Sequence, residues 1–321
     1  MTRIFQHELT KLFLFILVSF TGAALLAPHI YSWGKDLATL HGPFASDPVF
    51  WDSPTLWLAE KCDSAKFARY FNRALMGTAI ILLYPLIKSL RQKDSAETKA
   101  PLRQRINPKA QGLKDLGMGL LLSIGFLTAL VAALHQLGWV TMEESPNIGK
   151  AIQKAIVPAI IVSLLEEWLF RGVLYSVLLR QLSTAKTIIG LSLFFAAVHF
   201  LKPPDGAAVA DPRHALAGFE MLGLIGQKFL TASSFFGVFL TLFVVGATLA
   251  YTRFRTGKLW MAIGLHAGWV FSLKFVNSVT EPTGAANELM FNDKITDGVF
   301  PLIALALTGI CVALYLRPRK L

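Results

Sequence analysis

Charged side chains are scarce in this chain of 321 residues. Asp, Glu, Lys and Arg together make up 16% of it, against about 25% in a typical soluble domain. The shortage falls in windows of about twenty residues, the length that a helix needs to cross the hydrocarbon core of a bilayer. These windows exclude a soluble enzyme of ordinary architecture. The high share of hydrophobic residues, 54%, also excludes intrinsic disorder.

Cysteine is nearly absent as well. The two cysteines are Cys62, in a polar segment, and Cys311, in an apolar one, so a disulfide scaffold is excluded. The sequence contains no C-x-x-C or H-E-x-x-H motif. It also lacks the G-x-S-G and G-x-G-D motifs of serine and aspartyl intramembrane proteases. These absences remove several common kinds of metal, redox and protease site.

The chain has instead a series of long apolar stretches, and we expect an all-α fold: a polytopic membrane bundle of about eight transmembrane helices. The expected spans are 10–31, 71–90, 116–138, 155–178, 185–202, 230–252, 258–277 and 298–316. Two N-terminal helices, with an outer loop and a basic cytoplasmic loop, would form a first part, 1–115. A six-helix core, 116–321, would form the second.

The positive charges are concentrated in alternate loops. The net charge is +11, and the loop between the second and third spans alone carries Lys88, Arg91, Lys93, Lys99, Arg103, Arg105, Lys109 and Lys114. Cytoplasmic loops of membrane proteins are rich in Lys and Arg, so this pattern places both termini in the cytoplasm. We expect an integral multi-pass protein of the cell membrane, with anionic lipid at its cytoplasmic face and no nucleic-acid partner.

Segment 211–229 has a different pattern. It opens with Asp211-Pro212, a favourable helix start, and then places apolar residues at helical spacing. Two interpretations stay open at this point: an interfacial amphipathic helix, or a helical cap packed on the bundle.

The span 155–178 contains three ionisable residues, Glu166, Glu167 and Arg171. Each costs about 2.5–3.5 kcal/mol near the centre of a bilayer, so all three need partners inside the protein. Glu167 and Arg171 are four residues apart and can pair along the helix. Glu166 points about 100° away from Glu167 and must find a partner on another helix or in a water-filled cavity.

Two later spans each carry a histidine: His199, four residues after Phe195, and His266, between Gly264 and Gly268. Counting from the cytoplasmic ends of their helices, Glu166, His199 and His266 lie at overlapping depths of roughly 12–20 Å. We therefore expect these three side chains to meet in one cavity within the membrane. The two glycines indicate close helix packing, or access for a substrate backbone.

This set of residues supports two kinds of hydrolysis. A carboxylate beside a histidine can take a proton from water and deliver it to a leaving amine, while a second imidazole stabilises the oxyanion. The same Glu166, His199 and His266 are also a set of ligands that zinc accepts, with an open position for water. The residues alone leave open whether a metal such as zinc is bound.

The motif Glu166-Glu167-x-x-x-Arg171, followed by Phe195-x-x-x-His199 and then His266 on a third helix, resembles the CPBP family of CAAX-protease and bacteriocin-processing intramembrane endopeptidases. The resemblance covers about residues 155–277. It implies an eight-helix protease fold whose cavity holds a catalytic water. Some members are described as metalloproteases and others as glutamate proteases.

The resemblance also implies roles for individual residues. Glu166 would be the general base, His199 its partner on the water, and His266 would help to hold the oxyanion. Glu167, Arg171 and Phe195 would shape the site.

The chain departs from the family at one position, because the third motif usually has Asn or Asp four residues after its histidine. Here that residue is Val270, which cannot donate a hydrogen bond, and Asn277 lies about 16 Å along the helix from the site.

The function expected from these features is cleavage of a membrane-proximal or lipid-modified peptide by an intramembrane endopeptidase. One alternative is a non-catalytic membrane scaffold or immunity-type protein that retains the cavity. The presence of Val270 at the usual Asn or Asp position favours this alternative. Another is a proton-coupled transporter that uses the Glu and His side chains as a relay.

Overall fold

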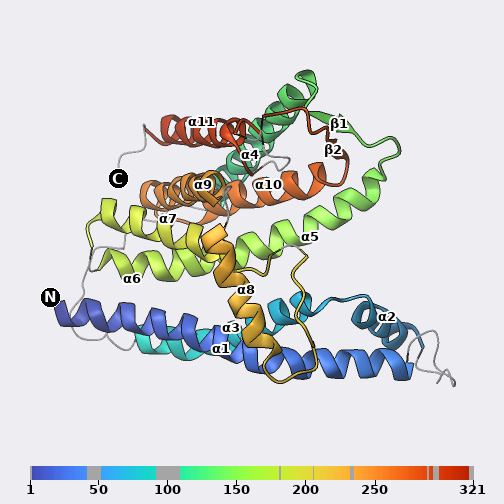
Figure 1. Cartoon of the computed structure of the whole chain (residues 1–321). Helices are drawn as coiled ribbons and strands as arrows, with labels where there is room; N and C mark the ends of the chain where they lie inside the picture. The colour runs from blue at the N-terminus through green and yellow to red at the C-terminus, as the bar shows by residue number, and fades with distance from the viewer. Residues whose placement is uncertain are drawn as a thin grey trace. The chain divides into compact units, whose positions relative to one another are not determined.

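The computed structural model describes residues 2–41, 52–91, 109–180, 182–204, 206–231, 235–287, 289–291 and 296–317 (Figure 1). The all-α expectation is confirmed, since the protein is a polytopic helical bundle. Six of the helices are long and apolar enough to cross a membrane, and two shorter apolar helices accompany them.

Each expected span coincides with a helix of this bundle. The helices are α1 (Thr2–His41), α3 (Phe67–Arg91), α4 (Lys109–Gln136), α5 (Ile148–Glu167), α7 (Thr184–Phe200), α9 (Phe235–Thr256), α10 (Trp260–Val276) and α11 (Val299–Leu316). The α5 helix continues through a π-helical stretch, η1 (Trp168–Leu174), into α6 (Tyr175–Leu179). Long apolar windows thus located the helices but not this change of helix type.

Contacts between residues divide the chain into two units. One unit comprises Met1–Thr98 and Phe200–Ala232, and the other comprises Lys99–His199 and Ser233–Leu321. The first unit contains α1, α3, the short helix α2 (Asp52–Asp63) and α8 (Ala217–Thr231). Residues 200–232 therefore pack with helices that precede them by more than a hundred positions in the sequence.

Helix α8 resolves the alternatives for segment 211–229 in favour of a packed helix. Gly218 lies so close to α1 that a Cβ atom there would be 1.9 Å from the carbonyl oxygen of Ala24. The helix begins five residues later than Asp211-Pro212 predicts, because the Asp211 side chain accepts a hydrogen bond from the backbone N–H of Arg213 in a turn. Arg213 also forms an ion pair with Asp36 of α1, at 2.8 Å.

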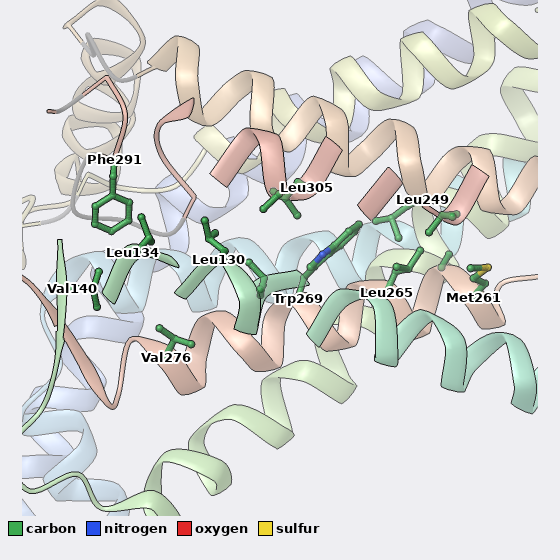
Figure 2. Packing of buried hydrophobic residues seen from close by; sticks show 14 of the residues in the cluster. Leu130, Leu134, Val140, Leu249, Met261, Leu265, Trp269, Val276, Phe291 and Leu305 are labelled. Atoms are coloured by element: carbon green, nitrogen blue, oxygen red, sulfur yellow. The ribbon is translucent and has the colours of Figure 1, made fainter. Parts of the chain in front are cut away.

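The core of the second unit surrounds α10. Trp269 of α10 lies among Leu130, Leu249 and Leu305, which come from α4, α9 and α11 (Figure 2). Gly264 allows α10 to approach α4, because a Cβ atom there would lie 2.2 Å from the carbonyl oxygen of Leu116. This close approach supports the packing interpretation of the glycines that flank His266.

The second unit also contains a short antiparallel ribbon that the sequence did not predict. It pairs β1 (Val140–Met142) with β2 (Thr280–Pro282), with Thr141 opposite Glu281. The strands follow α4 and α10 directly, so the ribbon joins the ends of two helices that already pack together.

Most of the basic loop between α3 and α4, residues 92–108, lies outside the described residues. Several charged residues of the other loops and of the C-terminal segment also lie outside the described residues, namely Asp47, Glu288, Asp293, Arg319 and Lys320. The orientation of the protein in the membrane stays a prediction.

Candidate active site

The second unit brings the ionisable residues of three helices together. Glu166 and Glu167 end α5, His199 lies in the last turn of α7, and His266 lies in the first half of α10. Glu166 is at the centre, because its Oε2 atom is 3.9 Å from Nε2 of His199 and 3.8 Å from Nε2 of His266. The sequence prediction that these three side chains meet within the apolar helices therefore agrees with the geometry.

The Glu166 carboxylate is oriented toward the interior of the site. Its side chain is 30% exposed, but Oε2 is buried and has no hydrogen-bond partner. A buried oxygen without a partner is costly, and such atoms in native proteins commonly bind water or an ion. The position of Oε2 between two imidazole nitrogens therefore marks a place for a small polar molecule.

The backbone fixes the orientation of the His199 ring. Its Nδ1 atom is 2.8 Å from the carbonyl oxygen of Phe195, one turn earlier in α7. A carbonyl oxygen can only accept, so Nδ1 carries the proton and Nε2 of the neutral ring presents a lone pair to Glu166. The buried Phe195 ring also contacts His199, with ring centroids 4.4 Å apart. Phe195 thus positions His199 through both its carbonyl group and its ring.

A carboxylate fixes the ring of His266 in the same way. Nδ1 of His266 donates to Oε1 of Glu167 over 2.7 Å. The same oxygen accepts a second bond from Nη1 of Arg171, at 2.9 Å, in the ion pair that the sequence predicted. Both Glu167 and Arg171 are completely buried. Helix spacing revealed the Glu167–Arg171 pair but gave no signal for the bond between Glu167 and His266, which depends on how α5 and α10 pack.

Arg171 has two further contacts. Its Nη2 atom donates to the carbonyl oxygen of Gly246 on α9, at 3.2 Å, and its guanidinium carbon lies 4.5 Å from the centre of the Phe195 ring. Gly246 is a site residue that the sequence analysis missed, because its contribution is a backbone carbonyl that no side-chain pattern can reveal. The buried positive charge is therefore surrounded by a carboxylate, a carbonyl group and an aromatic face.

Val270 is half-buried in α10, four residues after His266. Its side chain supplies no hydrogen-bond donor at the position where the family usually has Asn or Asp. Asn277 does not replace it, because Asn277 is the exposed residue that ends α10. Of the two imidazoles that the structure brings to Glu166, Nε2 of His199 presents a lone pair, so the available donor is His266 with both ring nitrogens protonated.

The spacing of the three side chains accommodates a bridging water molecule. Tetrahedral zinc, bound at about 2.1 Å, holds its ligand atoms about 3.4 Å apart. The separations of 3.8 and 3.9 Å are wider, and a water with hydrogen bonds of about 2.8 Å bridges them. Within the described ranges, no group of three His, Cys, Asp or Glu side chains is placed to hold a metal ion.

Comparison with known proteins gives a family for this part of the chain. Residues 149–272 match the family model described as type II CAAX prenyl endopeptidase Rce1-like. The matched segment begins in the first turn of α5, ends within α10 and contains all six of the predicted site residues. This family model belongs to the CPBP family, which the motifs of this chain resemble, and the Rce1-like family is a family of proteases. No curated protein and no solved structure matched the chain.

Proposed function

We propose that this protein is an intramembrane endopeptidase in which Glu166 activates a water molecule. The observation that supports this most directly is the buried, unpartnered Oε2 of Glu166, with an imidazole Nε2 on either side at 3.8 and 3.9 Å. A water in this position can transfer one proton to the carboxylate of Glu166. Its other hydrogen can form a hydrogen bond to the lone pair on Nε2 of His199.

The first step is the attack of this water on the scissile carbonyl carbon. Glu166 takes a proton as the new C–O bond forms, and the carbonyl oxygen becomes an oxyanion. His266 has the orientation needed to stabilise that charge, because Nδ1 is held by Glu167 and Nε2 faces the reaction. In the proposed mechanism His266 is an imidazolium, since only then can Nε2 donate.

The second step breaks the C–N bond. The tetrahedral intermediate collapses, the oxyanion becomes a carboxyl group, and Glu166 returns the proton to the departing amine. The carboxylate is thereby restored. In the absence of a donor at Val270, His266 is the principal group that holds the oxyanion, so this site contributes fewer oxyanion donors than the family pattern suggests.

The expected substrate is a membrane-proximal or lipid-modified peptide. The site lies on apolar helices, so a soluble peptide would have to leave water to reach it, whereas a lipid-anchored segment is already at the membrane. We also propose the cell membrane as the location, with cytoplasmic termini and anionic lipid at the cytoplasmic face.

The test compares three purified proteins in detergent: wild type, Glu166→Gln and Glu281→Gln. Each is incubated with prenylated and other membrane-peptide substrates, and the products are identified by mass spectrometry. Glu281 is an exposed residue of β2, so its substitution controls for the loss of a carboxylate. We expect cleavage by wild type and Glu281→Gln, and a loss of at least a thousandfold in Glu166→Gln, since Gln cannot accept the water proton.

The outcomes separate the alternatives. Retained cleavage by Glu166→Gln would remove Glu166 from the mechanism. A folded protein whose biological phenotype survives Glu166→Gln would be the scaffold or immunity-type protein. Proton-driven flux in liposomes without any peptide product would indicate the transporter. Activity that is lost on chelation and restored by zinc would show that a metal is required after all.

A further inference from the structure

The π-helical stretch η1 leaves one backbone carbonyl group without its usual partner. In an α-helix, the N–H of Tyr175 would donate to the carbonyl of Arg171, four residues earlier. Here it donates to the carbonyl of Phe170, five residues earlier. π-Helical stretches inside α-helices are rare and frequently lie at functional sites, and this one follows Glu166 and Glu167 directly. The Arg171 carbonyl therefore needs a partner from elsewhere.

That partner is Arg253 of α9. Its Nε atom donates to the carbonyl oxygen of Arg171 at 3.2 Å, and its Nη1 atom donates to the carbonyl oxygen of Gly257, just after α9 ends. The second bond fixes the guanidinium group, so that Nε points at η1. A cross-helix side chain thus replaces the hydrogen bond that the change of helix type removes.

Helix α9 contacts Arg171 at a second point. The side chain of Arg171 donates to the carbonyl of Gly246, two turns before Arg253. Gly246 lies close to α7, because a Cβ atom there would be 3.0 Å from the Cα of Ser192. The backbone and the side chain of Arg171 are therefore both bonded to one helix.

These contacts continue to the reacting atoms. Arg171 is bonded to Glu167, and Glu167 holds the ring of His266, whose Nε2 faces Glu166. A rotation of η1 about the helix axis would move the Arg171 side chain and, through Glu167, the imidazole. Small displacements of positioned groups are expensive, since about 1 Å can cost a hundredfold in rate.

We propose that Arg253 is a positioning residue, which holds the π-turn in the rotation that aligns Arg171, Glu167 and His266. This inference rests on the proposed function, because it concerns the geometry of the same site. Arg253 lies near the cytoplasmic end of α9 in the predicted orientation and touches none of the reacting groups itself.

Two variants of matched length isolate the hydrogen bond. Arg253→Gln keeps an N–H donor at the position of Nε. Arg253→Met has a side chain of the same length as Gln but no donor. Arg255→Met is the control, because Arg255 is also an arginine of α9 that donates to backbone carbonyl oxygens, but to those of Leu316 and Arg317.

Two measurements are made on each full-length variant in detergent. The first is kcat and KM for a substrate that wild type cleaves. We expect Arg253→Met to lower kcat about tenfold with KM within twofold, and Arg253→Gln to restore most of the loss. The second is amide hydrogen exchange over residues 171–176. We expect faster exchange there in Arg253→Met but not in Arg253→Gln or Arg255→Met.

The exchange measurement does not require cleavage, so the inference about Arg253 and the proposed function can be contradicted separately. Unchanged exchange and unchanged kcat in Arg253→Met would overturn the inference, as would a loss of kcat that Arg253→Gln does not restore. Absence of cleavage by wild type would count against the proposed function alone, and the exchange data would still show whether Arg253 holds the π-turn. If Arg253→Met does not fold, exchange in Arg253→Gln at the wild-type rate supports the inference, and faster exchange there contradicts it.

Discussion

At the scale of single residues, the site is organised by one buried carboxylate oxygen. Oε1 of Glu167 accepts from both Arg171 and His266, at 2.9 and 2.7 Å, so it joins a fixed positive charge to the imidazole that faces Glu166. The adjacent Glu166 has a different environment, with a buried oxygen that has no partner. Two neighbouring glutamates are thus suited to different tasks: Glu167 orients a ring, and Glu166 is available for chemistry.

This division predicts the effect of Glu167→Gln. The amide has the shape of the carboxylate but carries no charge. Its single oxygen can accept hydrogen bonds from Arg171 and His266, but it no longer neutralises the buried charge of Arg171. We expect kcat to fall at least a hundredfold with little change in KM, because the ring loses the negative charge that stabilises its imidazolium form. Steady-state kinetics on a cleaved peptide would measure this, with Glu144→Gln, a substitution in the loop before α5, as the control. Wild-type kcat in Glu167→Gln would show that the charge of Glu167 does not stabilise His266.

The sequence identified the ionisable residues of this site but not all of their partners. Charges within an apolar helix are conspicuous because each needs an internal partner, so Glu166, Glu167 and Arg171 could be singled out at once. The carbonyl groups of Phe195 and Gly246 were invisible, since every residue has one. The pairing of carbonyl groups with side chains depends on how the helices rotate and pack against one another. The spacing of residues in a single sequence does not reveal that arrangement.

At the scale of elements, α10 connects the core to the site. One side of the helix packs closely on α4, where Gly264 lies against the backbone of Leu116 and Gly268 against the side chain of Ser123. His266, between these two glycines, reaches α5. The eight apolar helices could be predicted because each contains a long apolar run with few charges. The β1–β2 ribbon and the helix α2 were missed because a three-residue strand pair and a short polar helix leave no comparable periodicity.

The tight contact between α10 and α4 predicts that Gly264→Ala destabilises the protein. Its new methyl group would lie 2.2 Å from the carbonyl oxygen of Leu116, so the helices must separate. We expect a loss of about 1–3 kcal/mol in stability and a fall in activity as His266 moves from Glu166. Gly117→Ala on α4 is the matched control, because its Cβ meets nothing within 4 Å. Thermal unfolding in detergent would decide; equal melting temperatures for the two variants would contradict the packing argument.

At the scale of the whole molecule, the grouping of residues differs from their order along the chain. Residues 200–232 pack with α1 and α3, although the sequence analysis placed them with the C-terminal core. A boundary drawn at one position, such as 115, cannot describe a unit made of two separate segments. The close contact of Gly218 with Ala24 is a backbone approach between distant segments, which has no local sequence signal beyond two small residues.

The predicted orientation can be tested on the intact protein. An even number of spans and the Lys and Arg bias of alternate loops place both termini in the cytoplasm. We expect a green fluorescent protein fused after Leu321 to fluoresce and alkaline phosphatase at the same position to be inactive. Phosphatase inserted in the loop between β1 and α5, next to Glu144, should be active.

The result bears directly on the proposed chemistry. With the termini in the cytoplasm, α7 runs from the cytoplasmic side toward His199, and α10 begins on the cytoplasmic side near His266. Prenylated protein tails are cytoplasmic, so a substrate of this kind would enter from that side of the membrane. The reverse pattern of reporter activity would contradict the charge argument, and it would favour substrates that approach from outside the cell.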